Sequence, residues 1–335
     1  MYFDFLCLFF GIANKNFYSS VNIVNLFQQM CVNALLAAGL TFPIILGGID
    51  ISVGSNMAVA GVVSALIGLH WFPNMGYGTA LLVLIVSAIV IGTVIGGVIG
   101  YLVAYRDLLP MICTLSFLTL LRGVAYIISG GGPVYGLPTS FGVLGAKRLI
   151  AIEGSFPNGL LPVSVIFTVI VVALMHWILT KTVFGRHVYA AGSNKDVAHL
   201  AGINVQKVTV ISHILCGICA SFAGVVTASK LQNGQPNIGE GYEMFAIASC
   251  VLGGTSLTGG RGTVGRAMFG VAVIAVINNG LNLLNVSAYW QKVAIGSIII
   301  VAVVLDMFQQ NVKSSIICEK MAGILVSAFC TKKTK

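Results

Sequence analysis

The stretch Lys181–Lys207 reads KTVFGRHVYAAGSNKDVAHLAGINVQK and separates two strongly apolar blocks in the second half of the chain. It carries four basic side chains and a single acid, Asp196. A short basic loop between two membrane spans stays in the cytoplasm, so this loop predicts the orientation of the helices on either side. Residues 194–203 predict a short helix with Ser193 or Asn194 as its N-cap. Composition leaves two interpretations open: a solvated loop, or a helix on which a cytoplasmic partner docks.

The composition of the whole chain is that of a membrane protein. Of its 335 residues, 57% are hydrophobic and 8% are charged, whereas about 25% charged residues is typical of soluble domains. Repeated apolar runs of about 20 residues match the thickness of a bilayer core. The short alternating segments of a β-barrel are absent from the sequence. The net charge of +9 comes mainly from basic residues beside apolar runs, which indicates membrane topology rather than nucleic-acid binding.

We therefore predict an all-α integral membrane protein with about ten transmembrane helices. The first is Tyr2–Ala13, a short apolar segment, and Lys15–Met30 is predicted to be interfacial or extracytoplasmic. The remaining spans are predicted at 29–46, 53–71, 78–104, 109–129, 161–180, 208–229, 243–254, 264–285 and 290–308. Residues 1–308 then form one transmembrane domain with its cytoplasmic loop at 181–207, and 309–335 form a basic cytoplasmic tail. Alternation of the spans places both termini in the cytoplasm.

Two glycine patterns bear on how these helices pack. Gly92, Gly96 and Gly100 recur every four residues and predict a helix face that another helix approaches closely. Leu46–Gly54 (LGGIDISVG) is similar to Leu252–Gly260 (LGGTSLTGG), and each follows an apolar run. Glycine pairs interrupt helices, and broken helices near the membrane centre often line binding sites. The predicted topology places both segments on the same side of the membrane.

Several polar residues in apolar surroundings are candidates for a translocation pathway. Asp50, with Ser52 close by, and Arg122 either line such a path or serve as a buried ion pair or interfacial anchor. Asn278 and Asn282 share one helix face, with Asn285 one turn further on. Amides on one face either bond neighbouring helices or contact a polar solute.

The segment Gln232–Tyr242 (QNGQPNIGEGY) is polar and is predicted to lie outside the membrane. Gln235, Glu240 and the adjacent Glu243 suit an extracytoplasmic loop that contacts a delivered solute or a delivery protein.

Motifs for enzymatic chemistry are missing from the sequence. There is no phosphate-binding loop of the form G-x-x-x-x-G-K-[ST], no H-E-x-x-H and no nucleophile elbow. Cys216 and Cys219 form a C-x-x-C in an apolar helix and are interpreted as small buried residues. We expect no bound cofactor or metal, and if ATP powers transport, another subunit must bind ATP and Mg²⁺.

Several ordered motifs carry a family resemblance. Gly47–Gly54 (GGIDISVG) resembles the GGIDLSVG signature of permease subunits of ribose-type ABC sugar importers. Further resemblance lies in YAAGSN at 189–194, LAGIN at 200–204, QPNIGEGYE at 235–243, LGGTSLTGGRG at 252–262, NNGLNLLN at 278–285 and SAYWQ at 287–291. Together these motifs cover roughly residues 17–308.

The resemblance implies a bacterial inner-membrane importer in which this chain is one of two permease subunits, identical or different. An ABC ATPase would dock on the cytoplasmic loops and a sugar-binding protein would dock outside. The helix at 194–203 would be the coupling helix, with contacts from Gly192, Asn194, Leu200, Ala201, Gly202 and Ile203. The motifs do not identify the sugar.

Two rival functions remain. An ion-coupled secondary transporter of a small polar solute would use Asp50 or Glu243 to carry the coupling ion. A membrane-embedded enzyme or structural subunit would need a nucleophile or metal cluster, for which the sequence has no motif.

Overall fold

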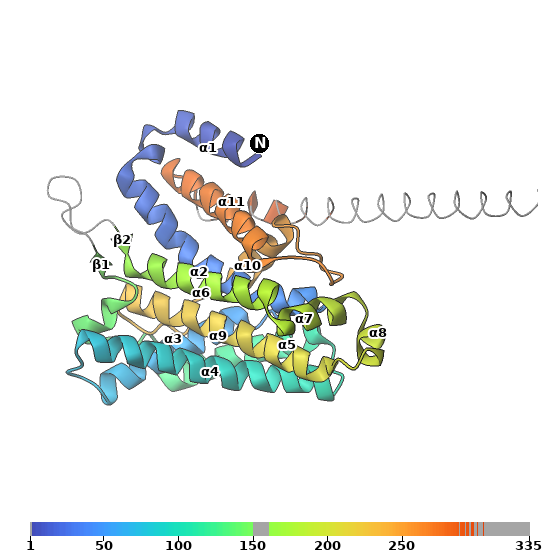
Figure 1. The fold of residues 1–335 in the computed structure, drawn as a ribbon. Helices are drawn as coiled ribbons and strands as arrows, with labels where there is room; N and C mark the ends of the chain where they lie inside the picture. Colours follow the sequence, from blue (N-terminus) through green and yellow to red (C-terminus); the bar gives the residue numbers. More distant parts are fainter. Residues whose placement is uncertain are drawn as a thin grey trace, which may run out of the picture.

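The computed structural model describes residues 2–149 and 161–287, together with 289–291, 293, 294, 296, 297, 300 and 304. These residues form a bundle of helices (Figure 1). The helices are α1 (Tyr2–Ala13), α2 (Ser20–Ile45), α3 (Val53–His70), α4 (Tyr77–Tyr105), α5 (Pro110–Ser129), α6 (Val163–Lys181), α7 (Val183–Ser193), α8 (Lys195–Leu200), α9 (Val205–Leu231), α10 (Tyr242–Leu252) and α11 (Val264–Leu283). Short 3₁₀ helices lie at Lys15–Tyr18 and Thr139–Val143, and β1 (Arg148–Leu149) pairs antiparallel with β2 (Leu161–Pro162).

Seven helices of the described part are long and apolar enough to cross a membrane: α2, α3, α4, α5, α6, α9 and α11. The all-α membrane fold is therefore confirmed, whereas the predicted number of about ten spans is not. α1 has 12 residues and α10 has 11, and a helix of 11 residues rises only about 16 Å, about half of a bilayer core. The predicted span at 290–308 lies mostly outside the described residues, and the tail at 309–335 lies wholly outside them.

One helix boundary differs clearly from the sequence-based prediction. α2 begins at Ser20 rather than at residue 29, so most of the segment predicted to be interfacial is the first part of a membrane helix. The Ser19 hydroxyl accepts a hydrogen bond from Asn22 N at 3.3 Å and thereby caps the helix. Hydropathy alone missed this start because polar residues occupy the first turns of α2.

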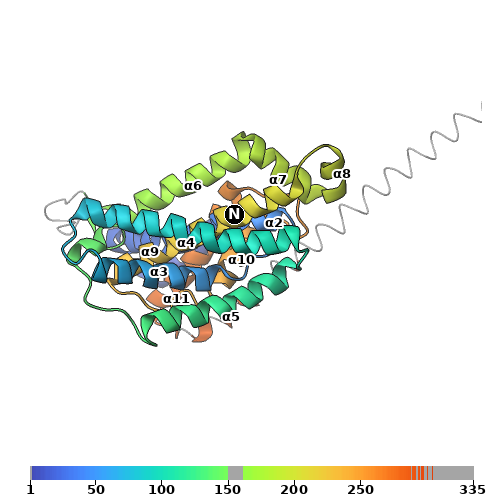
Figure 2. The same ribbon diagram turned by 90° about the horizontal axis from the view of Figure 1, so that it is seen from below.

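α9 lies at the centre of the bundle and packs against α2, α3 and, most extensively, α4 (Figures 1 and 2). The predicted glycine face is confirmed at this contact. A Cβ atom at Gly92 would collide with the backbone of Ile218, and one at Gly96 would collide with the His213 carbonyl. A Cβ atom at Gly100 would lie 2.8 Å from Val210 Cα. The glycines thus allow the two helix backbones to touch.

The C-x-x-C of α9 also serves packing. Cys216 and Cys219 are buried, and both lie against Gly39 of α2. Neither thiol is in a disulfide. This agrees with their interpretation as small core residues.

The two similar glycine segments lie side by side. α2 ends at Ile45 and α3 begins at Val53, and the backbone between them turns at Gly47 with φ 78°. Gly260 N donates to the Ile45 carbonyl at 2.8 Å, which joins the second segment to the first. Both therefore lie at the same end of the bundle, as the sequence predicted.

Gly96→Ala should destabilise the bundle because the added methyl group meets backbone atoms of α9 that cannot rotate away. Overpacking of this kind costs about 1–3 kcal/mol. The measurement is the thermal unfolding midpoint of the purified protein in detergent. Gly97→Ala is the matched control, since a Cβ atom there meets only the Ile214 side chain, at 3.8 Å. Equal midpoints for the two variants would contradict the assigned α4–α9 contact.

Candidate functional site: a polar chamber and an exposed helix

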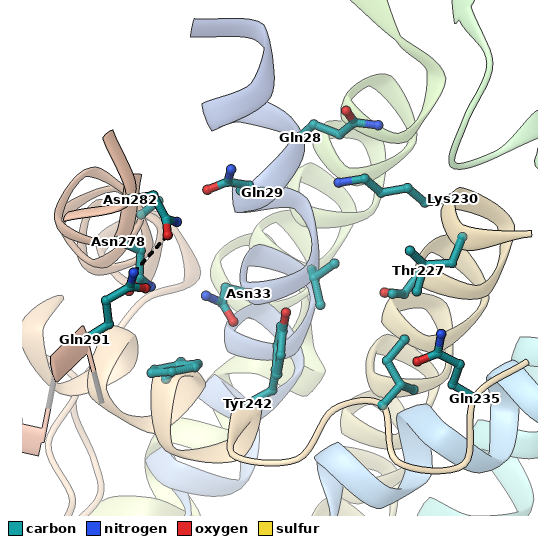
Figure 3. A pocket seen from close by; sticks show the side chains of 15 residues that line it. Gln28, Gln29, Asn33, Thr227, Lys230, Gln235, Tyr242, Asn278, Asn282 and Gln291 are labelled. Carbon is teal, nitrogen blue, oxygen red and sulfur yellow. Dashed lines mark hydrogen bonds between the residues drawn. The ribbon is translucent and has the colours of Figure 1, made fainter. Parts of the chain in front are cut away.

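A cavity of about 480 Å³ lies between α2, α9, α10 and α11 (Figure 3). We call it the chamber. Its volume is within the range of small-molecule sites, about 300–1,000 Å³. The polar side chains that line it come from every wall: Gln28, Gln29, Asn33, Thr227, Lys230, Gln235, Tyr242, Asn278, Asn282 and Gln291. Amides predominate, and none of the lining residues is an acid.

The asparagines of α11 divide between two roles that the sequence left open. Asn278 and Asn282 line the chamber, and Gln291 Nε2 donates to Asn282 Oδ1 at 2.8 Å. Asn279 is buried and exchanges hydrogen bonds of 2.9 Å with the amide of Asn22 on α2. Asn279 therefore joins α11 to α2, whereas Asn278 and Asn282 face the chamber, where a solute would lie.

The segment between α9 and α10 folds back into the bundle. Arg122 of α5 donates from Nη1 to the carbonyls of Pro236 and Ile238, both at 2.7 Å. Gly239 packs against the backbone of Gly54 at the start of α3. Arg122 is thus a loop anchor, and it fixes the wall of the chamber that carries Gln235 and Tyr242 without lining the chamber itself.

Glu240 and Glu243 were predicted together in an extracytoplasmic loop, and the structure separates them. Glu240 is exposed, whereas Glu243 lies in the first turn of α10 and is 8% exposed. Glu243 Oε1 accepts a hydrogen bond from Gly241 N at 3.2 Å. Both carboxylates interact electrostatically with Arg122, so they belong to the anchored segment.

Asp50 and Ser52 lie away from the chamber. Asp50 Oδ1 accepts hydrogen bonds from Ser52 N at 3.0 Å and from Ser52 Oγ at 2.6 Å, at the start of α3. Asp50 is 2% exposed. Their observed contacts organise the helix break, and their place on a solute path stays a prediction.

The predicted coupling segment forms a helix with an exposed side. Val197 N donates to Asn194 Oδ1 at 3.0 Å, so Asn194 is the N-cap of α8. Ala201 is the C-cap, Gly202 has φ 80°, and Ile203 N bonds to the Ala198 carbonyl at 3.0 Å. Leu200 is 86% exposed. A helix is thereby confirmed within 194–203, but α8 has only 6 residues, and Ala201–Ile203 form its C-terminal turn.

α7 connects α8 to the two glycine segments. Gly192 packs against the Ile45 carbonyl, and a Cβ atom at Gly259 would lie 2.8 Å from the Gly192 carbonyl. The Tyr189 hydroxyl donates to the Gly262 carbonyl at 2.6 Å. Burial raises the pKa of Tyr189 above its ordinary value.

The contribution of α2 and α9 to the chamber was not predicted from the sequence. Gln28, Gln29 and Asn33 are amides within an apolar helix, and such residues usually face a polar partner or cavity. Gln28 lies in the segment predicted to be interfacial, whereas Asn33 lies within the span predicted at 29–46. Within the described residues, no cluster of three or more His, Cys, Asp or Glu side chains could hold a metal ion.

Comparisons with known proteins agree with this architecture. The family described as the permease component of branched-chain amino acid transport systems matches residues 22–303. The ribose import permease of Bacillus subtilis (strain 168) is 39% identical over 301 residues, covering 90% of this chain and 89% of that protein. The D-allose transport system permease of Escherichia coli (strain K12) is 36% identical over 301 residues, covering 90% and 88%. The L-arabinose transport system permease of the same strain is 33% identical over 306 residues, covering 91% and 88%. No solved structure matches the chain.

Arg122→Gln should release the segment between α9 and α10 because two carbonyls lose a charged donor. We expect backbone amides in 236–241 to exchange with deuterium about tenfold faster, as local opening becomes easier. Hydrogen–deuterium exchange with mass spectrometry measures this effect. Arg106→Gln, at an exposed arginine after α4, is the control. Unchanged exchange in Arg122→Gln would contradict the anchoring role.

Proposed function

This chain belongs to the family of ABC importer permeases of the ribose type, and on that premise we propose that it forms the translocation pathway for a monosaccharide. It is a multi-pass protein of the bacterial inner membrane. Its named relatives are permeases for ribose, D-allose and L-arabinose. The chamber is the observation that carries the proposal, because its walls present neutral amides and hydroxyls that suit the hydroxyl groups of a sugar. Ribose is the first sugar to test.

The proposed mechanism is alternating access driven by a separate ATPase. The sequence has no phosphate-binding loop, so ATP and Mg²⁺ belong to that partner. The ATPase docks on α8, whose apolar Leu200 is almost wholly exposed. α7 then carries the movement to the end of α2 and to the second glycine segment, because Gly192 contacts Ile45 and Gly260, and Tyr189 bonds Gly262 just beyond that segment.

The chamber and the docking helix lie toward opposite ends of the bundle, which supports the proposed orientation. In this orientation α7 and α8 lie at the cytoplasmic end. The chamber lies toward the extracytoplasmic end, where a sugar-binding protein delivers its ligand. A second permease subunit, identical or different, completes the pathway. A permease of this kind needs only weak contacts with the sugar, because tight binding would slow release.

An ion-coupled transporter is not favoured by these contacts. Such a protein needs a carboxylate on the solute path, and neither Asp50 nor Glu243 lines the chamber. Asp50 instead bonds Ser52, and Glu243 lies beside the anchored segment.

The proposal is tested by extracting the chain gently from native membranes and identifying its partners by mass spectrometry. We expect a P-loop ATPase and an extracytoplasmic binding protein. Proteoliposomes that contain the recovered complex should take up labelled D-ribose or a related sugar only when ATP is supplied. Uptake that collapses with an uncoupler while ATP is held constant would overturn the proposal in favour of ion coupling.

Leu200→Ser should weaken association with the ATPase, since it removes an apolar contact from an exposed helix without altering the bundle. We expect recovery of the ATPase to fall about tenfold, as for an interface hot spot. Quantitative co-purification with normal yield and thermal midpoint of the permease is the readout. The control is Tyr135→Ser, which changes a residue that is 65% exposed and lies after α5, away from α8. Normal ATPase recovery with Leu200→Ser would exclude α8 as the docking helix.

A further inference from the structure

The chamber contains two buried amides that differ in their bonding. Gln28 and Asn33 of α2 are each 7% exposed, and both line the chamber. Gln28 Nε2 donates to the Gly145 carbonyl at 2.9 Å, so its amide links α2 to the segment after α5. Asn33 Oδ1 has no hydrogen-bond partner among the described residues. Figure 3 shows Asn33 directed into the space between α2, α10 and α11.

An unpaired buried amide is costly, and a membrane interior makes it more so because water is scarce. Some polar residues that join helices of this bundle are fully paired. Asn22 and Asn279 bond each other, and Asn56 accepts from Ser221 Oγ at 3.0 Å while it donates to the Gly217 carbonyl at 3.1 Å. Eight buried side-chain polar atoms in the described part of the chain have no hydrogen-bond partner, and of these Asn33 Oδ1 is the one whose residue lines the chamber.

We infer that Asn33 is a solute-binding residue of the chamber, and that its amide oxygen accepts a hydrogen bond from a hydroxyl group of the transported molecule. This inference rests on the proposed function and specifies the contact within it. Tyr242 from α10 and Asn278 from α11 line the same cavity from other walls, so several hydroxyl groups find partners at once.

The charge of the chamber restricts the solute further. Lys230 extends from α9 toward α2 and is the single charged side chain among the lining residues (Figure 3). No lining residue is a carboxylate that would neutralise it or attract a cation. The solute class is therefore a hydroxyl-rich molecule without positive charge.

The test measures binding directly, without requiring transport. Thr227→Cys places a reporter thiol in the chamber, in a chain whose Cys7, Cys318 and Cys330 are changed to serine. The remaining cysteines, at 31, 113, 216, 219 and 250, are buried. The full-length chain is placed in nanodiscs, and the rate of modification by a small thiosulfonate reagent is followed as D-ribose, D-allose, L-arabinose or xylitol is added.

We expect at least one of these neutral polyols to slow modification of the reporter. Adding Asn33→Leu should raise the half-protecting concentration about tenfold, the effect of losing one good hydrogen bond. Because leucine is similar in size and has no unpaired polar atom, Asn33→Leu should keep or raise the thermal midpoint, whereas a structural role would lower it. D-glucosamine, which is cationic, should protect less than the neutral sugars.

Asn25→Leu is the matched control, since Asn25 lies two turns earlier on α2 and does not line the chamber. It should leave protection unchanged. Protection that is absent, or equal in the Asn33→Leu and parent proteins, would overturn the inference. ATP-driven uptake with no dependence on Asn33 would leave the proposed function intact and refute this contact. Protection that depends on Asn33 in a chain whose uptake needs no ATPase would refute the proposed function alone.

Discussion

The fold depends on how peptide groups are paired where membrane helices are interrupted. Lipid offers no hydrogen bonds, so irregular backbone is tolerated only where protein or a wet cavity satisfies it. The part of the chain that the structure describes contains three such interruptions, after α2, after α9 and after α10. Asp50 and Ser52 organise the first, Arg122 holds the second, and the bond from Gly260 N to the Ile45 carbonyl joins the third to the first. Of these anchors, Arg122 bears on the chamber, because it fixes the segment that carries Gln235 and leads into Tyr242.

The sequence predicted features that depend on local pattern. The four-residue spacing of Gly92, Gly96 and Gly100 predicted a close helix contact, since only glycine brings two backbones together. The Asn194 cap and the short helix after it follow from local chemistry. The apolar runs predicted an all-α membrane fold, because hydropathy measures compatibility with lipid.

Features that depend on the depth of a residue in the membrane, or on hydrogen bonds between residues far apart in the chain, could not be predicted from the sequence. Arg122 bonds two carbonyl groups more than a hundred positions away, and carbonyls have no sequence signature. α10 is apolar but has only 11 residues, which is too short for a span. The segment before it folds back against α3, so the helix begins only at Tyr242. The place of Asn33 on the chamber wall could not be predicted, because the sequence does not show whether a buried amide has a hydrogen-bond partner.

The contact between Gly192 and the Ile45 carbonyl has a mechanical consequence. Both groups are backbone atoms, and the Gly259 backbone closes on Gly192 from the other side. Side-chain contacts can yield by changing rotamers, whereas close-packed backbone atoms have no such freedom. α7 is thus held by backbone contacts between the end of α2 and the second glycine segment, so a displacement of α7 has to move at least one of them.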